Sequence, residues 1–351
     1  MKGSIERVRA VIAGQTPDSA PMFDLLRNDA VISHFAGETL TVENAPEVVY
    51  AAYEPAIDAT RPNVGLPKHE STETLPDGRS VRRFRWTEWI EHVTYADTAA
   101  YAAAKREVID TYDPAWSDEK QAWVDGYLAG IAAERGRLGE VFFCPGGGCV
   151  GLMCIMAEVG VEFFSYALAD CPGIIDELME INTIAAIAWI DRLPPGHGIE
   201  MAFCGDDIAY KTGPFMSPAW FAEHHFPRLA RINDALHRQG IKVLFHSDGN
   251  LNSILDGLVE AGIDGLNPIE VLAGMDVAEI HRRHPHLFMC GGIDVSQLLP
   301  LGTPAEVGDA VRRAIDAAEG RIMIGSSTEL NNEVPLANFL ALRDAVLEST
   351  A

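Results

Sequence analysis

Acidic, imidazole and thiol side chains recur in this chain at the ends of short apolar segments of strand length. Near the N-terminus, the segment 20–26 contains Asp24, and Arg27 and Asp29 lie just beyond it. The residues that end or follow the later segments are Asp206, Asp207, His246, Asp248, Glu270, Cys290, Asp294, Ser326, Ser327 and Glu329. Such side chains transfer protons and bind metal ions, although an Asp after a strand also serves as the N-cap of the next helix. Their recurrence after successive segments indicates an enzyme.

The clearest group is formed by His246, Asp248 and Glu270. His246 and Asp248 are two residues apart at the end of one segment, so both side chains point the same way if that segment is a strand. Glu270 ends the next segment. One imidazole and two carboxylates make a three-ligand zinc site with an open fourth position, but a hydrogen-bonded His–Asp pair that orders a loop fits the same pattern. Cys290 is a further ligand as a thiolate, or a small core residue as a thiol.

The elements that position these residues alternate between strand and helix patterns. From about residue 140 onward, apolar segments of strand length are separated by helical patterns, and these segments are 198–207, 242–250, 263–270, 287–294 and 321–331. Thr303 and Glu306 form a capping box that opens the helix ending near Gly320. Alternation at this spacing predicts parallel βαβ units. We therefore expect a (β/α)8 barrel, with the polar strand ends gathered at its carboxyl rim.

The N-terminal third is less regular. Residues 75–95 alternate around Asp77-Gly78, which predicts a β-hairpin. We expect a single domain over residues 1–351, with an irregular insertion of hairpin and helices at about 40–140.

Composition restricts the partners and the compartment. The chain has 351 residues and a net charge of −24, from 51 acidic and 27 basic residues, which disfavours nucleic acid and anionic membranes as partners. We expect no signal peptide and no transmembrane helix. None of the six cysteines forms a CxxC pair, so reduced thiols and a cytoplasmic location are expected. The run CPGGGC at 144–149 indicates a tight backbone approach, and no phosphate-binding Gly-Lys-Ser/Thr follows it.

Several segments together resemble the uroporphyrinogen decarboxylase superfamily. They are RVRAVIAGQTPDSAPMFD, GDDIAYKTGPFMSPAWFAEHHFPRL, KVLFHSDGNLNSILDGLVEAGIDGLNPIE, CGGID and GTPAEV. Porphyrinogen-decarboxylating members carry an arginine-rich Met-Arg-Gln-Ala-Gly-Arg segment after the first strand, whereas this chain has MFDLLRNDAV with Arg27 alone. A substrate with eight carboxylates needs several cationic partners, so the resemblance does not extend to porphyrinogen as substrate.

Another branch of the superfamily is similar at the chemical residues. Cobalamin-linked methyltransferases, and more distantly cobalamin-independent methionine synthase, hold zinc with His-x-Cys, a Glu in some members and a distal Cys. By resemblance, His246 takes the His position, Asp248 the position of the first Cys, and Glu270 the Glu position. Ser326 and Ser327 lie near the place of the distal Cys. Oxygen ligands in place of thiolates are better suited to activating an oxygen, such as a methyl ether, than a thiol.

The resemblance implies a methyltransferase or O-demethylase component. It would move a methyl group between a small-molecule substrate and a corrinoid on a separate protein, because this chain has no cobalamin-binding Asp-x-His-x-x-Gly. The alternative is a metal-free decarboxylase or lyase that uses Asp24, Arg27 and His246. A third class of function is a non-catalytic scaffold. A homodimer is compatible with each of these functions. The predicted catalytic residues are Asp24, Asp207, His246, Asp248 and Glu329; the substrate-binding residues are Arg27, Asp29, Asp294, Ser326 and Ser327; the zinc ligands are His246, Asp248, Glu270 and Cys290.

Overall fold

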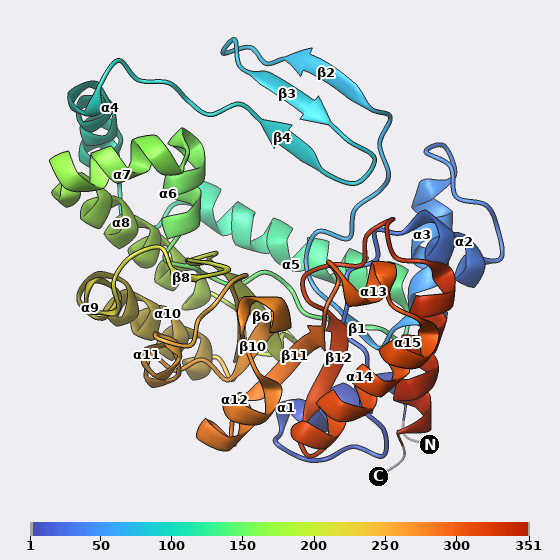
Figure 1. Cartoon of the computed structure of the whole chain (residues 1–351). Helices are drawn as coiled ribbons and strands as arrows, with labels where there is room; N and C mark the ends of the chain where they lie inside the picture. Colours follow the sequence, from blue (N-terminus) through green and yellow to red (C-terminus); the bar gives the residue numbers. More distant parts are fainter. Residues whose placement is uncertain (1–2, 350–351) are drawn as a thin grey trace.

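The computed structural model describes residues 3–349, in which a ring of parallel strands is surrounded by helices (Figure 1). Five strands form one parallel sheet in the order β12-β11-β10-β9-β6. Their bounds are β6 Met201–Gly205, β9 Lys242–His246, β10 Gly265–Ile269, β11 Phe288–Ile293 and β12 Ile322–Ser326. A second parallel sheet pairs β1 (Ala59–Thr60) with β5 (Phe142–Phe143).

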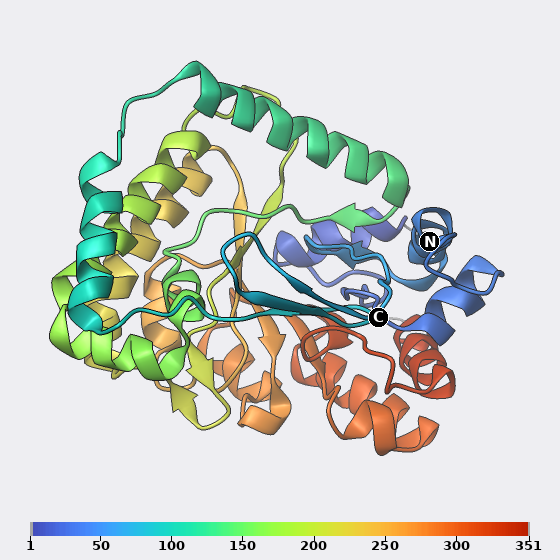
Figure 2. The same cartoon turned by 90° about the horizontal axis from the view of Figure 1, so that it is seen from above.

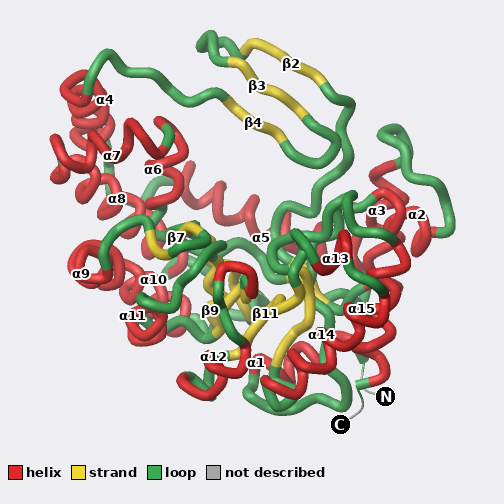
Figure 3. Tube along the Cα trace, in the orientation of Figure 1, coloured by secondary structure: helices red, strands yellow, loops and turns green. Residues whose placement is uncertain are grey.

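Isolated parallel bridges join the two sheets into a ring. The segment around Met22 and Phe23 bridges Ile324 of β12 on one side and Ala59 of β1 on the other, and Gly146, after β5, bridges Phe203 of β6. A continuous strand was expected over 20–26. This segment instead pairs with its neighbours through isolated bridges at single residues. The (β/α)8 barrel predicted from the strand–helix alternation is confirmed, and its strands lie inside a shell of helices (Figure 3).

The helices between successive strands make up this shell. Ser217 caps α9 through its side chain, and the helical run continues through a π-helical turn, η1, to Arg238. The predicted capping box of Thr303 and Glu306 is present at the start of α14. The helical bounds are α1 Ser4–Ile12, α2 Asp29–Ala36, α3 Ala45–Ala56, α4 Thr98–Thr111, α5 Asp118–Leu138, α6 Leu152–Val159, α7 Val161–Asp170, α8 Pro172–Ile190, α9 Pro218–Trp220, η1 Phe221–His225, α10 Phe226–Arg238, α11 Leu255–Glu260, η2 Val271–Ala273, α12 Val277–Arg283, α13 Leu298–Leu301, α14 Pro304–Ala317 and α15 Leu336–Glu348.

The amino-terminal end of the barrel is closed by α1. Val8 and Val11 of this helix pack in one buried apolar cluster with side chains from the strands of the ring. The strand residues of this cluster are Phe23, Ala59, Phe142, Cys144, Met201, Leu244, Phe288, Cys290 and Met323. The interior is thus a packed core below the carboxyl rim, which leaves the rim as the place for chemistry.

An insertion between β1 and α5 lies over this rim. It contains an antiparallel sheet of β2 (Ser71–Thr74), β3 (Ser80–Arg83) and β4 (Glu88–Ile90), followed by α4. Figure 2, viewed from above, shows the sheet lying across the barrel. The turn at Asp77-Gly78 was predicted, whereas the third strand was not. Within the expected insertion of about 40–140, α3 and α5 pack side by side as wall helices and α5 packs on β5.

A second small hairpin, β7 (Ala209–Tyr210) with β8 (Gly213–Pro214), follows β6 at the rim. Among residues 3–349, no single helix is long and apolar enough to cross a membrane; only α6 and α7 together reach that composition, and they are bent by 111° at their junction.

Candidate functional site

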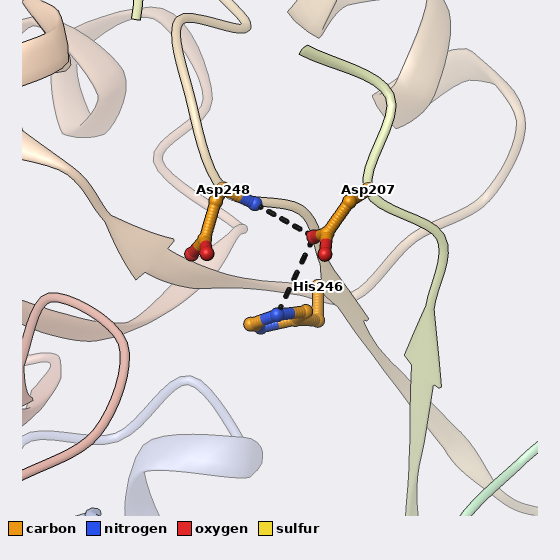
Figure 4. Close-up of side chains that lie close together, drawn as sticks. All are labelled: Asp207, His246 and Asp248. Atoms are coloured by element: carbon orange, nitrogen blue, oxygen red, sulfur yellow. Dashed lines mark hydrogen bonds and ion pairs between the residues drawn. The ribbon is translucent and has the colours of Figure 1, made fainter. Parts of the chain in front are cut away.

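Three side chains converge at the carboxyl ends of two neighbouring strands, β6 and β9 (Figure 4). His246 is the last residue of β9, and its strand partner is Gly205 of β6. This register places Asp207, two residues beyond Gly205, next to Asp248, two residues beyond His246. One potential ligand atom from each of these side chains lies within 4.8 Å of the others. We call Asp207, His246 and Asp248 the rim trio.

The imidazole of His246 is held with one nitrogen free. Its Nδ1 donates to Oδ1 of Asn267 on β10 over 2.7 Å, which leaves the lone pair on Nε2. Nε2 lies 3.6 Å from Oδ1 of Asp207. Only 8% of the residue is exposed, and burial lowers its pKa against the opposing effect of Asp207, so the ring is neutral near pH 7. A neutral imidazole whose second nitrogen is hydrogen-bonded is the usual form of a metal ligand.

Asp248 lies among like charges and is poorly hydrogen-bonded. Its Oδ1 is buried and has no hydrogen-bond partner among the described residues. Its Oδ2 accepts from the hydroxyl of Thr328 over 3.5 Å. Burial, followed by the charges of Asp207 and Glu270, raises the pKa of Asp248 to about 7. A bound cation stabilises a buried carboxylate that lies beside like charges more than it stabilises a solvent-exposed carboxylate.

Glu270 supports the loop of the trio. Its Oε2 accepts from the backbone N–H of Gly249 over 2.6 Å. Gly249 has φ +94°, and a Cβ there would lie 2.7 Å from the backbone of Ala209 on β7. The loop after β9 is therefore pressed against the loop after β6, and the N–H of Asp248 donates to Asp207 over 3.0 Å.

Two arginines and a glutamate occupy the opposite side of the rim. Arg27 donates to Oε1 of Glu329 over 2.7 Å, and Arg61 lies 3.4 Å from its Oε2. Arg61 is 8% exposed and stands over the ring of Phe203, 5.2 Å from its centroid. The other neighbour of that ring is His246, at 4.8 Å. Burial lowers the pKa of Arg61. Its contact with the ring that also touches His246 places this cation close to the trio, and at 3.4 Å it is only loosely paired with Glu329.

Sequence reasoning missed Arg61, although a signal was present. Arg61 directly follows the apolar segment that contains β1, as the other rim residues follow their strands. That strand has two residues and lies within the region taken as an insertion, which concealed the pattern.

Asp24 joins the first and last segments of the ring. It accepts from the backbone N–H and the hydroxyl of Ser326, each at 2.8 Å, and from the N–H of Leu25. Burial raises its pKa to about 6. Ser327, also buried, accepts from the N–H of Val295. The predicted residues Asp24, Ser326 and Ser327 thus lie at the rim, with their polar groups engaged inside the protein.

Three further predicted residues have partners elsewhere in the fold, and one of them, the predicted ligand Cys290, requires a correction. Asp29 accepts from Arg85 and from the indole of Trp86, and so holds the inserted sheet to the barrel. Asp294 accepts from the N–H groups of residues 296–298 at the start of α13, as a helix cap. Cys290 packs in the core of the barrel, where burial raises the pKa of its thiol.

Of the expected ligands His246, Asp248, Glu270 and Cys290, the first two belong to the group of side chains that could hold a metal ion within residues 3–349, and Asp207 is its third member. Glu270 serves as a support. Asp207 was predicted as a catalytic residue and not as a ligand.

Asp206, next to the trio, has a different environment. It accepts from the first N–H groups of α6, at residues 151–153, and contacts Nε2 of His225 at 3.1 Å. His225 is buried, whereas His224 pairs with Asp176 on the outer surface. The two adjacent histidines therefore do not form a pair of ligands.

Comparisons with known proteins agree with this architecture. The family model described as "Uroporphyrinogen decarboxylase (URO-D)" matches residues 144–349. No curated protein matches the chain. A methyltransferase from Methanosarcina mazei has a similar structure, with a TM-score of 0.69 and 18% identity, over 99% of this chain and 99% of that chain. A B12-independent methionine synthase from Shewanella sp. W3-18-1, solved with selenomethionine, gives a TM-score of 0.45 and 10% identity over 94% and 97% of the two chains.

Proposed function

Because the chain belongs to the uroporphyrinogen decarboxylase family, as its sequence segments predicted, we propose that it is a methyl-transfer enzyme of that family. It acts as a methyltransferase or O-demethylase component, which moves a methyl group between a small-molecule substrate and a corrinoid. The observation that carries the proposal is the rim trio. The fold shared with a methyltransferase over 99% of both chains is compatible with this activity.

The trio fits a zinc ion. Nε2 of His246 is free because Nδ1 donates to Asn267, and Oδ1 of Asp248 is buried without a partner among the described residues. Two ligand atoms of a tetrahedral zinc lie about 3.4 Å apart, and Nε2 of His246 lies 3.6 Å from Oδ1 of Asp207. When bound, the metal supplies a Lewis acid that polarises the substrate heteroatom from which the methyl group departs.

The protein's own residues perform the remaining tasks. Asn267 orients the imidazole of His246, and Glu270 fixes the loop that carries Asp248. Arg61 and Arg27 place positive charge opposite the trio, where an anionic group of the substrate competes with Glu329 for them. The inserted sheet lies over this rim (Figure 2).

The corrinoid is expected on a separate protein, since the chain has no binding motif of its own. A cytoplasmic location is part of the proposal, and the six free cysteines are compatible with it.

The test is the metal content and activity of protein purified without chelator. We expect about one zinc per chain, and methyl transfer from methyl ethers, amines or thiols to a supplied corrinoid protein. His246→Gln should lose both the zinc and the activity. The control is His281→Gln, because His281 is also 8% exposed but lies on α12, outside the trio. A His246→Gln protein with full zinc and full activity would remove the trio from the mechanism.

A metal-free decarboxylase is the second candidate, and the buried Arg61 favours it. In this reaction Arg61 and Arg27 hold the carboxylate that departs, and Asp248, whose pKa is raised to about 7, returns a proton to the carbanion. Release of carbon dioxide by chelator-treated protein at an undiminished rate would decide for this alternative.

A further inference from the structure

A large cavity opens on the flank of the barrel, away from the rim trio. It has a volume of about 640 Å³ and lies between α5, α8 and the glycine-rich loop that follows β5. Small-molecule sites commonly measure about 300–1,000 Å³ and are lined mainly by apolar and aromatic groups. None of the residues of the rim trio or of the arginine side lines this cavity, so the function proposed above leaves it unexplained.

One wall of the cavity is a group of aromatic rings in a fixed arrangement. Trp123 and Tyr127 of α5 are stacked with an interplanar angle of 5° and 5.7 Å between centroids. Trp189 of α8 meets both rings edge-on, at 5.7 and 5.2 Å. Trp123 is 54% exposed, although a large aromatic side chain is normally covered. Flat faces and edges held in this way bind another aromatic ring with favourable stacking geometry.

The facing walls consist of small residues. A Cβ at Gly147 would lie 2.5 Å from Sγ of Cys204, and one at Gly148 would lie 2.8 Å from Cβ of Ala186. The loop can therefore lie flat against β6 and α8 only because these positions are glycines. Ala185 and Ala188 of α8 complete this side. Small walls opposite large rings leave a space that no side chain of this region fills.

The polar groups of the cavity indicate which hydrogen bond a ligand would make. Asn182 donates through Nδ2 to the carbonyl of Val150, while its Oδ1 has no hydrogen-bond partner among residues 3–349. Lys120 is the one charged residue in the lining, and its ammonium donates to the carbonyls of Asp113 and Ala115. The cavity thus offers a free acceptor and no free charge.

We infer that this cavity is a second ligand site, which takes a neutral, flat aromatic molecule with a hydroxyl or N–H donor. The rings of α5 and α8 stack on the ligand, and Oδ1 of Asn182 accepts its proton donor. The inference does not rest on methyl transfer or on zinc, because it uses neither the rim trio nor the arginines.

Binding of 2-naphthol, a flat bicyclic alcohol, tests the inference directly. Trp116, Trp123 and Trp189, three of the six tryptophans, line the cavity. We expect 2-naphthol to quench the tryptophan fluorescence of the full chain with a saturable curve, and calorimetry to give the same Kd. The double variant Ala185→Leu/Ala188→Leu fills the cavity, and its Kd should rise at least tenfold.

The matched control is Ala103→Leu, an exposed alanine within α4 that does not line the cavity. It should bind as the wild type does. Should the double variant not fold, Trp123→Ala replaces it, because the half-exposed ring contributes little to the core and its loss should also weaken binding about tenfold. Absence of saturable quenching by the wild type up to about 1 mM, or equal Kd values in the filled and control variants, overturns the inference. Zinc content measured on the same samples shows whether the cavity substitutions also disturb the rim trio.

Discussion

Replacing Asp248 with Asn should have opposite effects on stability without and with zinc. In chelator-treated protein, Asp248 is a buried carboxylate beside Asp207 and Glu270, and its pKa is raised from 3.8 to about 7. A shift of that size corresponds to about 4 kcal/mol between the two protonation states. Because the pKa of Asp248 is higher in the folded than in the unfolded state, its contribution to the free energy of unfolding is fully present below about pH 4. This contribution is lost as the pH rises through about 7. The metal-free Asn variant should therefore be more stable than the wild type at pH 8, by up to about 4 kcal/mol, and this difference should vanish near pH 4.

Zinc should make the wild type more stable than the Asn variant. A ligand that binds only the folded state stabilises it by an amount that grows with its concentration relative to Kd. The wild type, with three ligand groups, should gain more stability from zinc than the variant, which keeps only the neutral imidazole of His246 and the carboxylate of Asp207. The assay is urea unfolding at pH 8, with chelator and with a measured excess of free zinc. Equal stabilisation of both proteins by zinc, or a less stable variant in chelator, would refute the reasoning.

Four further outcomes are expected. Gly249→Ala should destabilise the protein by about 1–3 kcal/mol and weaken zinc binding, because its Cβ would meet the backbone of Ala209; urea unfolding and metal titration measure both. Asp24→Asn removes a carboxyl whose pKa is raised to about 6; the stability of the wild type relative to this variant should fall between pH 4 and 7 by up to about 3 kcal/mol. Arg61→Met should keep its zinc but raise KM about tenfold or more, because the anionic group of the substrate loses one of the two guanidinium groups proposed to hold it. Uroporphyrinogen should not be decarboxylated at an ordinary rate of about 1 per second, as a chromatographic assay for coproporphyrinogen will show.

Residue spacing predicted part of the site and could not predict the rest. His246 and Asp248 come together because strand side chains alternate with a period of two, which a sequence displays directly. Asp207 joins them through the register of β6 against β9, and register between strands distant in sequence is set by packing of the whole barrel. The side chain of Glu270 arrives at the expected strand end but turns to the N–H of Gly249.

Cys290 shows how a strand end can be misplaced. Cys290 was counted among the residues at strand ends, but β11 continues to Ile293, so Cys290 lies in mid-strand and within the core. Glycines at 291 and 292 have positive φ values of 104° and 86°, a local backbone feature that allows a strand to continue irregularly. The barrel itself was predictable because strand–helix alternation depends on periodicities short enough to see in one sequence.

The electrostatics of the rim support the proposal that the trio is a metal site and not only a structural network. A structural network satisfies its members, as Asp24 is satisfied by Ser326 and the N–H of Leu25. Asp248, in contrast, lies among carboxylates with one oxygen unpaired within the described chain, while the nearby Arg61 is shared with Glu329. Such an arrangement lowers the stability of the folded protein by several kcal/mol when the carboxylate is ionised. A bound cation removes this penalty, and a cation at this position faces the arginines across the space in which a substrate would lie.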